Sequence, residues 1–442
     1  MKKLRFSVLF AVLMLIALPV RAELFGLKGY VLENGMRVVV VPNHKAPIAK
    51  HMVWYKVGAA DEKLGKGGSA HLLEHLMFRG TRKVRGQSFN RILEENGADS
   101  NAFTAQDVTA YHEFVDISRL ELVMALEADR MRNLSIDDES FETERKIVYQ
   151  ERKQVVENNP LYKFNEELQR LFWQNHQYSR PITGSENEIL SLTDKDVKDI
   201  YRHYYAPNNA VLVIAGDIEP ETAFRLAEKY YGDIKPAKVP ENRLKFDTEV
   251  KTKTTLRMKL PNIELPRLVK KYHVPGYAEA KGGIYAYMVL SKYLGEGEVS
   301  KLYVDLVVNR KMATGVSTDY NFTAPSGGSF SISAIPAKGV SVDEMTAALD
   351  DSVKQAMSEL NDRTLQKYKK QMLSGLVYAK DSPNEAAQIV GMLATAGMGD
   401  DEIENYADNI EKVTVADVKK AYMQMLQSPQ TEAVVEPEGA KK

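Results

Sequence analysis

The chain has 442 residues, a formal net charge of −1, 44% apolar and 27% charged residues, and no cysteine. These values exclude a fibrous or disordered protein, a disulfide scaffold and a thiolate metal site. They also give no reason to expect nucleic acid or an anionic membrane surface as a partner. The length is typical of two or more domains.

The first 22 residues have the pattern of a secretory signal peptide. Three cationic residues among the first five precede an apolar run over 6–20, and Val20 and Ala22 supply the small residues of a cleavage site. The run is too short to cross a bilayer comfortably. We therefore expect residues 1–22 to be removed, leaving no membrane span. The absence of cysteine excludes a lipid anchor on cysteine and suits a periplasmic or secreted bacterial protein.

An internal repeat indicates that the chain is built from two similar halves. Residues 192–201 (LTDKDVKDIY) and 413–422 (VTVADVKKAY) share Thr, Asp, Val, Lys and Tyr in register, at a spacing of 221. A turn with proline and an apolar run follow each copy. Thr193 and Thr414 each precede an aspartate by three residues, which is typical of the start of a helix. Because the copies lie near the ends of two similar lengths of chain, duplication is the better interpretation.

The first half, residues 23–236, is predicted to begin with two short strands around the Asn34-Gly35 turn. Its further elements, in chain order, are a strand over 48–57, a helix over 68–79, a helix over 88–97 that stops at Gly97, and longer helices over 117–133 and 140–158.

A charged, proline-containing linker is predicted at 237–250, followed by a second half at 251–442. The second half repeats the pattern, with strands near 252–275 and 314–335 and helices near 282–295, 342–360, 364–380 and 384–397. Strands grouped with helices, without strict βαβ alternation, favour an α+β fold: two similar halves, each an antiparallel-rich sheet with helices packed on it.

The segment His71-Leu72-Leu73-Glu74-His75 carries the chemistry of the first half. On a helix, positions i and i+4 lie about 40° apart, so both imidazoles project from one face and can share one ion. Glu74 borders that face, where it can reach a metal-bound water. Imidazole nitrogens suit Zn²⁺, whose catalytic sites take three protein ligands and leave one position for water. Eight histidines in 442 residues make a chance occurrence of this pattern rare.

A third ligand is needed; the chain has no cysteine to supply it, and the other histidines have no ligand-like spacing. Glu144 and Glu151 are seven residues apart, so they lie on one face of a helix with about 20° of drift. One of them could be a ligand and the other a supporting carboxylate. The spacing does not say which is which, and the surrounding charged residues equally suit an ordinary solvated helix face.

These residues resemble the pitrilysin (insulinase) family of zinc peptidases, which includes the mitochondrial processing peptidases and bacterial relatives. The resemblance extends to LENGMRVVVVPN, the Gly67-Gly68 pair before the motif, NAFTAQDVTAY, EADRM and HYYAPNNAVLVIAGDIEPE. It covers nearly the whole mature chain and is weaker after about residue 250.

The resemblance implies a role for each site residue. His71, His75 and Glu151 are expected to bind one Zn²⁺ per chain, Glu74 to act as general base on a zinc-activated water, and Glu144 to support a ligand. The edge-strand residues that the resemblance assigns to substrate are Asn101, Ala102, Phe103 and Thr104, which would pair with an extended peptide in a cleft between the halves.

The second half departs from this chemistry. Aligning Gly67-Gly68 with Gly282-Gly283 replaces the two histidines and the base by apolar residues (Ala286, Val289 and Leu290). Some family members also carry an Arg and a Tyr, seven apart, that hold substrate and stabilise the oxyanion. Here Val307 and Thr314 occupy those positions, and Arg310 and Tyr320 are out of register.

Three kinds of function follow, of which the third is a zinc-dependent hydrolase that acts on something other than peptides. The first is an exported zinc-dependent endopeptidase or oligopeptidase that works as a heterodimer with a zinc-free homologue carrying the Arg–Tyr pair, or as a homodimer. The second is a non-catalytic structural or assembly subunit of the same fold, against which the intact zinc residues argue. Metal content and sensitivity to a chelator separate the first two.

Overall fold

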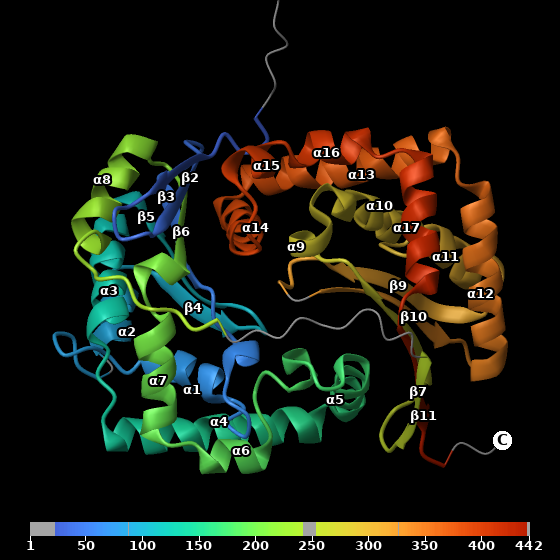
Figure 1. Ribbon diagram of the computed structural model, residues 1–442, viewed down its shortest axis with the longest axis horizontal. Helices are drawn as coiled ribbons and strands as arrows, with labels where there is room; N and C mark the ends of the chain where they lie inside the picture. The colour runs from blue at the N-terminus through green and yellow to red at the C-terminus, as the bar shows by residue number, and fades with distance from the viewer. Residues whose placement is uncertain (1–22, 87, 242–252, 326, 440–442) are drawn as a thin grey trace, which may run out of the picture.

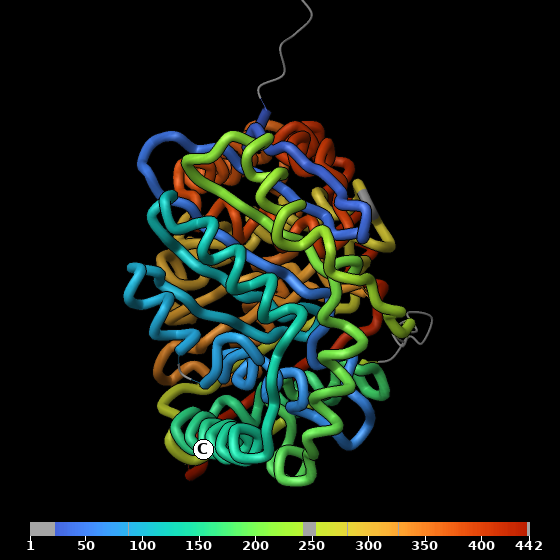
Figure 2. The backbone as a smooth tube through the Cα atoms, turned by 90° about the vertical axis from the view of Figure 1, so that its left-hand side faces the viewer, coloured from blue at the N-terminus to red at the C-terminus, as the bar shows by residue number. Residues whose placement is uncertain are grey.

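The computed structural model describes residues 23–86, 88–241, 253–325 and 327–439. The predicted signal peptide 1–22 and most of the predicted linker 237–250 lie outside the described residues. Helices and strands form two units placed next to one another along the long axis (Figure 1). Seen from the side, the N-terminal unit lies in front of the C-terminal one (Figure 2).

The first unit contains a six-stranded mixed sheet with the order β1-β2-β6-β3-β5-β4. Its strands are β1 (Lys28–Val31), β2 (Arg37–Pro42), β3 (Ile48–Tyr55), β4 (Asp99–Thr104), β5 (Thr109–Asp116) and β6 (Ala210–Gly216). Only β2 and β6 pair in parallel; the other pairs are antiparallel. The run AVLVIAG of β6 is wholly buried, as a central strand covered on both faces requires.

The second unit contains a five-stranded sheet with the order β7-β11-β8-β10-β9. Its strands are β7 (Lys253–Leu260), β8 (Arg267–Val274), β9 (Ala313–Asn321), β10 (Gly328–Pro336) and β11 (Gln430–Pro437). This order matches the order β2-β6-β3-β5-β4 in the first sheet, if β7 to β11 are matched to β2 to β6 in chain order. Again a single pair, β7 and β11, is parallel. The two halves therefore share one topology, as the internal repeat predicts.

The repeated segments occupy equivalent places in the two units. They form α7 (Asp194–Tyr204) and α17 (Val415–Gln427), and each helix begins with a capping box, at Thr193 and Thr414 respectively. Each helix then leads into the strand that pairs in parallel, β6 or β11. The duplication thus includes the local signal that starts the helix.

One face of each sheet is covered by helices of its own half. On the first sheet these are α1 (Ser69–Met77), α2 (Ser88–Glu95), α3 (Leu120–Asn133) and α8 (Pro220–Tyr231), while α7 packs on α1, and α4 (Asp138–Asn158) and α6 (Glu186–Ser191) lie further out. On the second sheet they are α10 (Ile284–Leu294), α12 (Val342–Glu359) and α17. Besides α14 (Pro383–Thr395), the second half also contains α9 (Tyr277–Ala280), α11 (Lys301–Tyr303), α13 (Asp362–Asp381), α15 (Asp400–Glu404) and α16 (Tyr406–Lys412).

The other face of each sheet is covered by a helix that belongs to the opposite half. Helix α14 (Pro383–Thr395) packs on Trp54 and Val213 of the first sheet, and Gly391 permits this approach because a Cβ there would lie 2.2 Å from Trp54 Nε1. Helix α5 (Pro160–Trp173) packs on Ala433 and Val435 of the second sheet. Each half thus lends one helix to the sheet of the other. The two helices occupy equivalent places in the chain, since α5 follows the long helix α4 and α14 follows the long helix α13.

This exchange leads to a prediction about the independence of the halves. If a protease site is inserted between residues 242 and 252 and cut, we expect the two fragments to stay together on gel filtration without denaturant. Either half expressed alone should be insoluble, because it exposes the apolar sheet face that the other half's helix covers. Two separable, folded fragments would contradict the exchanged packing.

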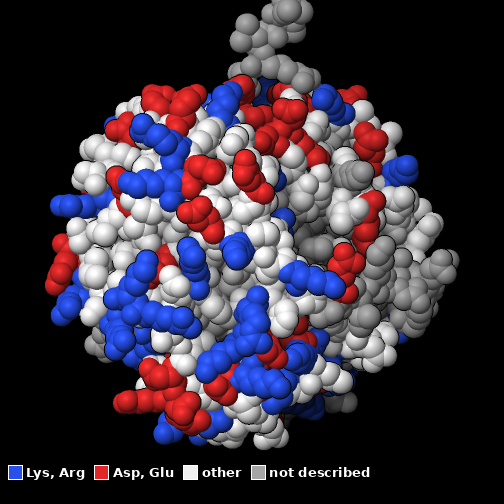
Figure 3. Space-filling view, turned by 60° about the vertical axis from the view of Figure 1, so that its left-hand side comes forward, with Lys and Arg blue, Asp and Glu red and all other residues white. Residues whose placement is uncertain are grey.

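Among the described residues, no helix combines the length and the apolarity that a membrane crossing needs. Side chains of both charge signs lie next to one another on the face shown in Figure 3. A small net charge therefore coexists with many local charge pairs.

Candidate metal centre and active site

Helix α1 carries the H-x-x-E-H motif on the side of the first sheet nearest to α4. Leu72, Leu73 and Leu76 are at most 1% exposed and fix the helix on the sheet. The helical period then places His71 and His75 together on another face, with their ring centroids 4.9 Å apart. Helix packing thus directs both imidazoles towards α4.

His71, His75 and Glu151 form the only group of three or more potential metal ligands found in the described residues. One donor atom from each lies within 4.8 Å of the other two. Glu151 Oε2 is 3.4 Å from His75 Nε2 and 3.9 Å from His71 Nε2. Two imidazole nitrogens and a carboxylate oxygen are a donor set that suits zinc, so these residues could hold one such ion.

Glu144 lies one step behind this cluster. It is buried in the face of α4 that meets α1, and its Oε2 is 3.0 Å from His75 Nδ1. The guanidinium of Arg79 donates to the other carboxylate oxygen. Because Nδ1 of His75 faces Glu144, Nε2 of the same ring is left for a ligand, which is the usual arrangement behind a metal-binding histidine.

The ionisable groups of the cluster influence one another strongly. Burial and the nearby His75 lower the pKa of His71 to about 4. Burial would also lower the pKa of His75, but its hydrogen bonds to Glu144 and Glu151 outweigh that effect and raise the pKa to about 9. The pKa of Glu151 is lowered, chiefly by its hydrogen bond with His75. The carboxylates of Glu144 and Glu151 thus favour the positively charged form of the His75 ring.

Glu74 lies beside the two histidines and contacts the edge strand. The Thr104 hydroxyl on β4 donates to Glu74 Oε2 at 2.5 Å. Burial raises the pKa of Glu74, although the bond from Thr104 opposes the shift. A carboxylate with a raised pKa next to a metal site is suited to accept and return a proton.

Strand β4 carries the four residues predicted to bind substrate. It pairs with β5 on one side and has no strand partner on the other among the described residues. Asn101 is exposed, whereas Phe103 packs edge-on against Trp54 at 5.4 Å between ring centroids. Ala102 packs against the core of the first sheet. The four residues therefore differ in availability, while the backbone edge is open.

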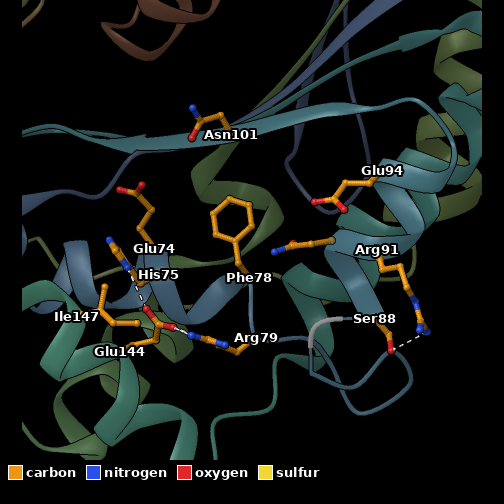
Figure 4. A pocket seen from close by; sticks show the side chains of 11 residues that line it. Glu74, His75, Phe78, Arg79, Ser88, Arg91, Glu94, Asn101, Glu144 and Ile147 are labelled. Atoms are coloured by element: carbon orange, nitrogen blue, oxygen red, sulfur yellow. Dashed lines mark hydrogen bonds and ion pairs between the residues drawn. The ribbon is translucent and has the colours of Figure 1, made fainter.

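A pocket of about 800 Å³ opens next to Glu74 and His75 (Figure 4). Helix α1 and the turn after it, with Phe78 and Arg79, form one wall, helix α2 forms the opposite wall, and Asn101 of β4 lies above them. The side chains that line it from α2 are Ser88, Asn90, Arg91 and Glu94. The pocket thus lies between the histidine motif and the edge strand β4.

Arg79 is a site residue that the sequence analysis missed. It follows His75 by four residues, one helical turn, so it returns to the same side of the chain as the histidine. The spacing was a usable signal, but the contact with Glu144 depends on how α4 packs against α1, which no local pattern reveals.

The second half has no counterpart of this cluster among the described residues. Helix α10 takes the place of α1, and Ala286, Val289 and Leu290 are buried in its apolar core. The Tyr320 hydroxyl donates to the Pro275 carbonyl at 2.6 Å.

The residues at or near the positions of the expected Arg–Tyr pair do not join the cluster either. Arg310 is ion-paired with Asp351 at 3.2 Å and Asp305 at 3.5 Å. Val307 packs against the core, and Thr314 is exposed. Arg310 and Tyr320 are thus already engaged within their own half.

Comparison with protein families gives two adjoining matches. Residues 37–186 match the family described as Insulinase (Peptidase family M16), and residues 191–372 match its companion, described as Peptidase M16 inactive domain. The first match contains the whole cluster of His71, Glu74, His75, Glu144 and Glu151.

Individual relatives point the same way. Zinc protease PqqE of Helicobacter pylori is 32% identical over 289 residues, which are 64% of each chain. A probable mitochondrial-processing peptidase subunit beta of Schizosaccharomyces pombe is 30% identical over 206 residues, 47% of this chain and 45% of the relative. The aligned region thus spans just under two thirds and about half of these two relatives.

A solved structure is similar over almost the full length. The crystal structure of a protease from Helicobacter pylori superposes with a TM-score of 0.85 at 25% identity, covering 93% of this chain and 99% of the other. The two-unit fold is therefore shared with a protein described as a protease.

Proposed function

The chain belongs to the insulinase family of zinc metallopeptidases (family M16), and on that premise we propose that it is an exported zinc-dependent endopeptidase or oligopeptidase. The observation that carries this proposal is the convergence of His71, His75 and Glu151 beside the carboxylate of Glu74. The signal-like first 22 residues support export, to the periplasm or beyond the cell.

The proposed ligands of one zinc ion are His71 Nε2, His75 Nε2 and a carboxylate oxygen of Glu151. Zinc in such a site supplies Lewis acidity, which polarises a carbonyl group and makes water more acidic. Glu144, held by Arg79, orients the His75 ring through Nδ1. The chain itself thus provides the geometry in which zinc would act.

Glu74 is proposed as the general base. It takes a proton from the attacking water and returns it to the leaving nitrogen of the cleaved peptide. The bond from Thr104 restrains the carboxylate on the side of β4. Thr104 therefore ties the base to the strand that is proposed to bind the substrate.

The open edge of β4, including Asn101 to Thr104, is proposed to pair with an extended peptide backbone by β-augmentation. The pocket beside Glu74 would then receive one side chain next to the scissile bond. Because backbone pairing is independent of side chains, specificity would come mainly from this pocket.

We further propose a partner that completes the site. Val307 and Thr314 replace the expected Arg–Tyr pair, and Arg310 and Tyr320 are engaged elsewhere. A missing oxyanion donor can cost on the order of 10²–10³ in rate. A zinc-free homologue carrying Arg and Tyr is favoured over a homodimer, and one relative is itself named as a subunit, mitochondrial-processing peptidase subunit beta.

The test is cleavage of a peptide library by the purified mature chain, alone and with co-purifying proteins. We expect weak, chelator-sensitive cleavage that zinc restores, and strong cleavage once the companion is added. A chain without zinc and without activity under all conditions would favour a structural or assembly subunit. Full activity of the chain alone, lost on Arg310→Ala or Tyr320→Phe, would exclude the partner.

A further inference from the structure

The first turn of helix α1 is held by a buried glutamate from the preceding loop. Glu62 is 4% exposed; its Oε1 accepts the N–H of Ala70 at 2.8 Å, and its Oε2 accepts the N–H of Gly68 at 3.1 Å. Ala70 is the residue directly before His71. The Glu62 carboxylate thus binds the backbone of α1 immediately before His71.

This helix needs an external cap. Gly68 precedes α1 in the left-handed region at φ 84°, and a Cβ there would lie 2.5 Å from the Thr183 carbonyl oxygen, so the position requires glycine. Glycine has no side chain to satisfy the free N–H groups at a helix start. Because α1 has only nine residues, it also has little stability of its own. Glu62 supplies from the loop what Gly68 lacks.

Neighbouring hydrogen bonds connect the loop around Glu62 to the segment of α4 that carries Glu151. Arg180 Nη1 donates to the Glu62 carbonyl at 2.8 Å, and Glu188 Oε1 accepts the N–H of Gly67 at 3.3 Å. Thr183, from the same segment, receives a hydrogen bond at 3.3 Å from Arg152, the residue after Glu151. The segment 180–188 therefore links the start of α1 to α4.

The metal-free half shows what the same place looks like without such a residue. Gly276 corresponds to Gly58, since both have a backbone N–H bonded to the acid three residues on and both lie against the loop after the edge strand. The segment from there to the double glycine is three residues shorter in the second half.

At the start of α10, Gly283 offers no side chain to cap the helix, and a pocket of about 600 Å³ opens there, lined among others by Gly282, Gly283 and Glu279. The first half thus has a buried carboxylate bonded to the first turn of α1, whereas the corresponding helix of the second half begins beside a pocket.

We propose that Glu62 is a positioning residue for His71: by fixing the first turn of α1 through Gly68 and Ala70, it holds the His71 ring at the distance from His75 and Glu151 that a shared zinc ion requires. The inference rests on the proposed zinc site. A first turn that frays would move His71 while leaving His75, one turn further on, in place.

The test compares Glu62→Gln with a matched control. The amide keeps the shape of the side chain but turns an N–H₂ donor towards one of the two backbone N–H groups. The control is Glu404→Gln, because Glu404 also accepts two backbone N–H groups, from Phe25 at 3.1 Å and Leu27 at 2.6 Å, away from the cluster. Zinc affinity is measured by competition with a chelator, together with the visible absorption of the cobalt(II) form and the thermal midpoint of the metal-free protein.

For Glu62→Gln we expect zinc binding weaker by about 10–100-fold, the loss typical of a group that orients a ligand, and an altered cobalt spectrum. The metal-free midpoint should fall no more than in Glu404→Gln, and kcat should fall with KM unchanged. Wild-type zinc affinity and cobalt spectrum in Glu62→Gln would overturn the proposal.

If Glu62→Gln does not fold, Glu62→Asp is measured instead, since aspartate keeps the carboxyl group but is too short to reach both N–H groups. The proposal then requires the same weaker zinc binding and altered cobalt spectrum in Glu62→Asp. A wild-type protein that binds no zinc would instead refute the proposed function.

Discussion

Replacing Glu74 by glutamine should abolish peptide hydrolysis while zinc stays bound. An amide cannot take a proton from water, and proton transfer by a positioned side chain contributes about 10²–10⁴-fold to a rate. The proposed ligands are untouched, and the glutamine can still accept the bond from Thr104 through its carbonyl oxygen. The measurements are turnover of a cleaved peptide and zinc content after dialysis.

The matched control is Glu95→Gln, an exposed carboxylate on α2 that pairs with Arg91 and does not line the pocket. It should retain full turnover. Residual activity of Glu74→Gln above a few per cent of wild type would remove Glu74 from the role of base, and loss of zinc would make it a ligand instead.

Replacing Glu151 by alanine should remove bound zinc, whereas Glu144→Ala should retain it more weakly and work poorly. Glu151 Oε2 faces both imidazole Nε2 atoms, but Glu144 reaches only Nδ1 of His75. Losing a direct ligand costs more affinity than losing an orienting group, which typically costs about 10–100-fold. Zinc stoichiometry and the chelator-competition affinity measure the difference.

Without zinc, we expect Glu144→Ala to lower the free energy of unfolding more than Glu151→Ala does. Glu144 is buried and paired with Arg79, so its removal leaves a partly buried guanidinium without its carboxylate, whereas Glu151 is half-exposed. Glu142→Ala on the same helix is the control, because Glu142 pairs with Arg145 near the surface, away from the histidines. Stoichiometric zinc in Glu151→Ala together with none in Glu144→Ala would show that the two roles are reversed.

The residues that lie together in the candidate site could be picked out from the sequence because their signals are local. The histidines at i and i+4 and the glutamates seven apart each lie on one helix, where a short-range period fixes which side chains share a face. The repeat at 192–201 and 413–422 is likewise a local pattern, and its capping threonines start equivalent helices in both halves. The shared topology of the two halves follows from this repeat, because each repeated helix leads into the strand that pairs in parallel with the first long strand of its half.

Which glutamate meets which histidine nitrogen was decided by tertiary structure. The spacing put Glu144 and Glu151 on one face, but their places relative to Nδ1 and Nε2 depend on how α4 packs against α1. The same holds for Arg79 and Glu62, whose partners lie on another helix or across a loop.

The placement of the exchanged helices α5 and α14 was likewise decided by tertiary structure and not by the sequence pattern. Their apolar faces belong to any buried helix, and nothing along the chain says that each covers the sheet of the opposite half. Hydrophobic burial is non-directional, so sequence specifies that a face must be covered, and only the packing of the whole chain specifies by what.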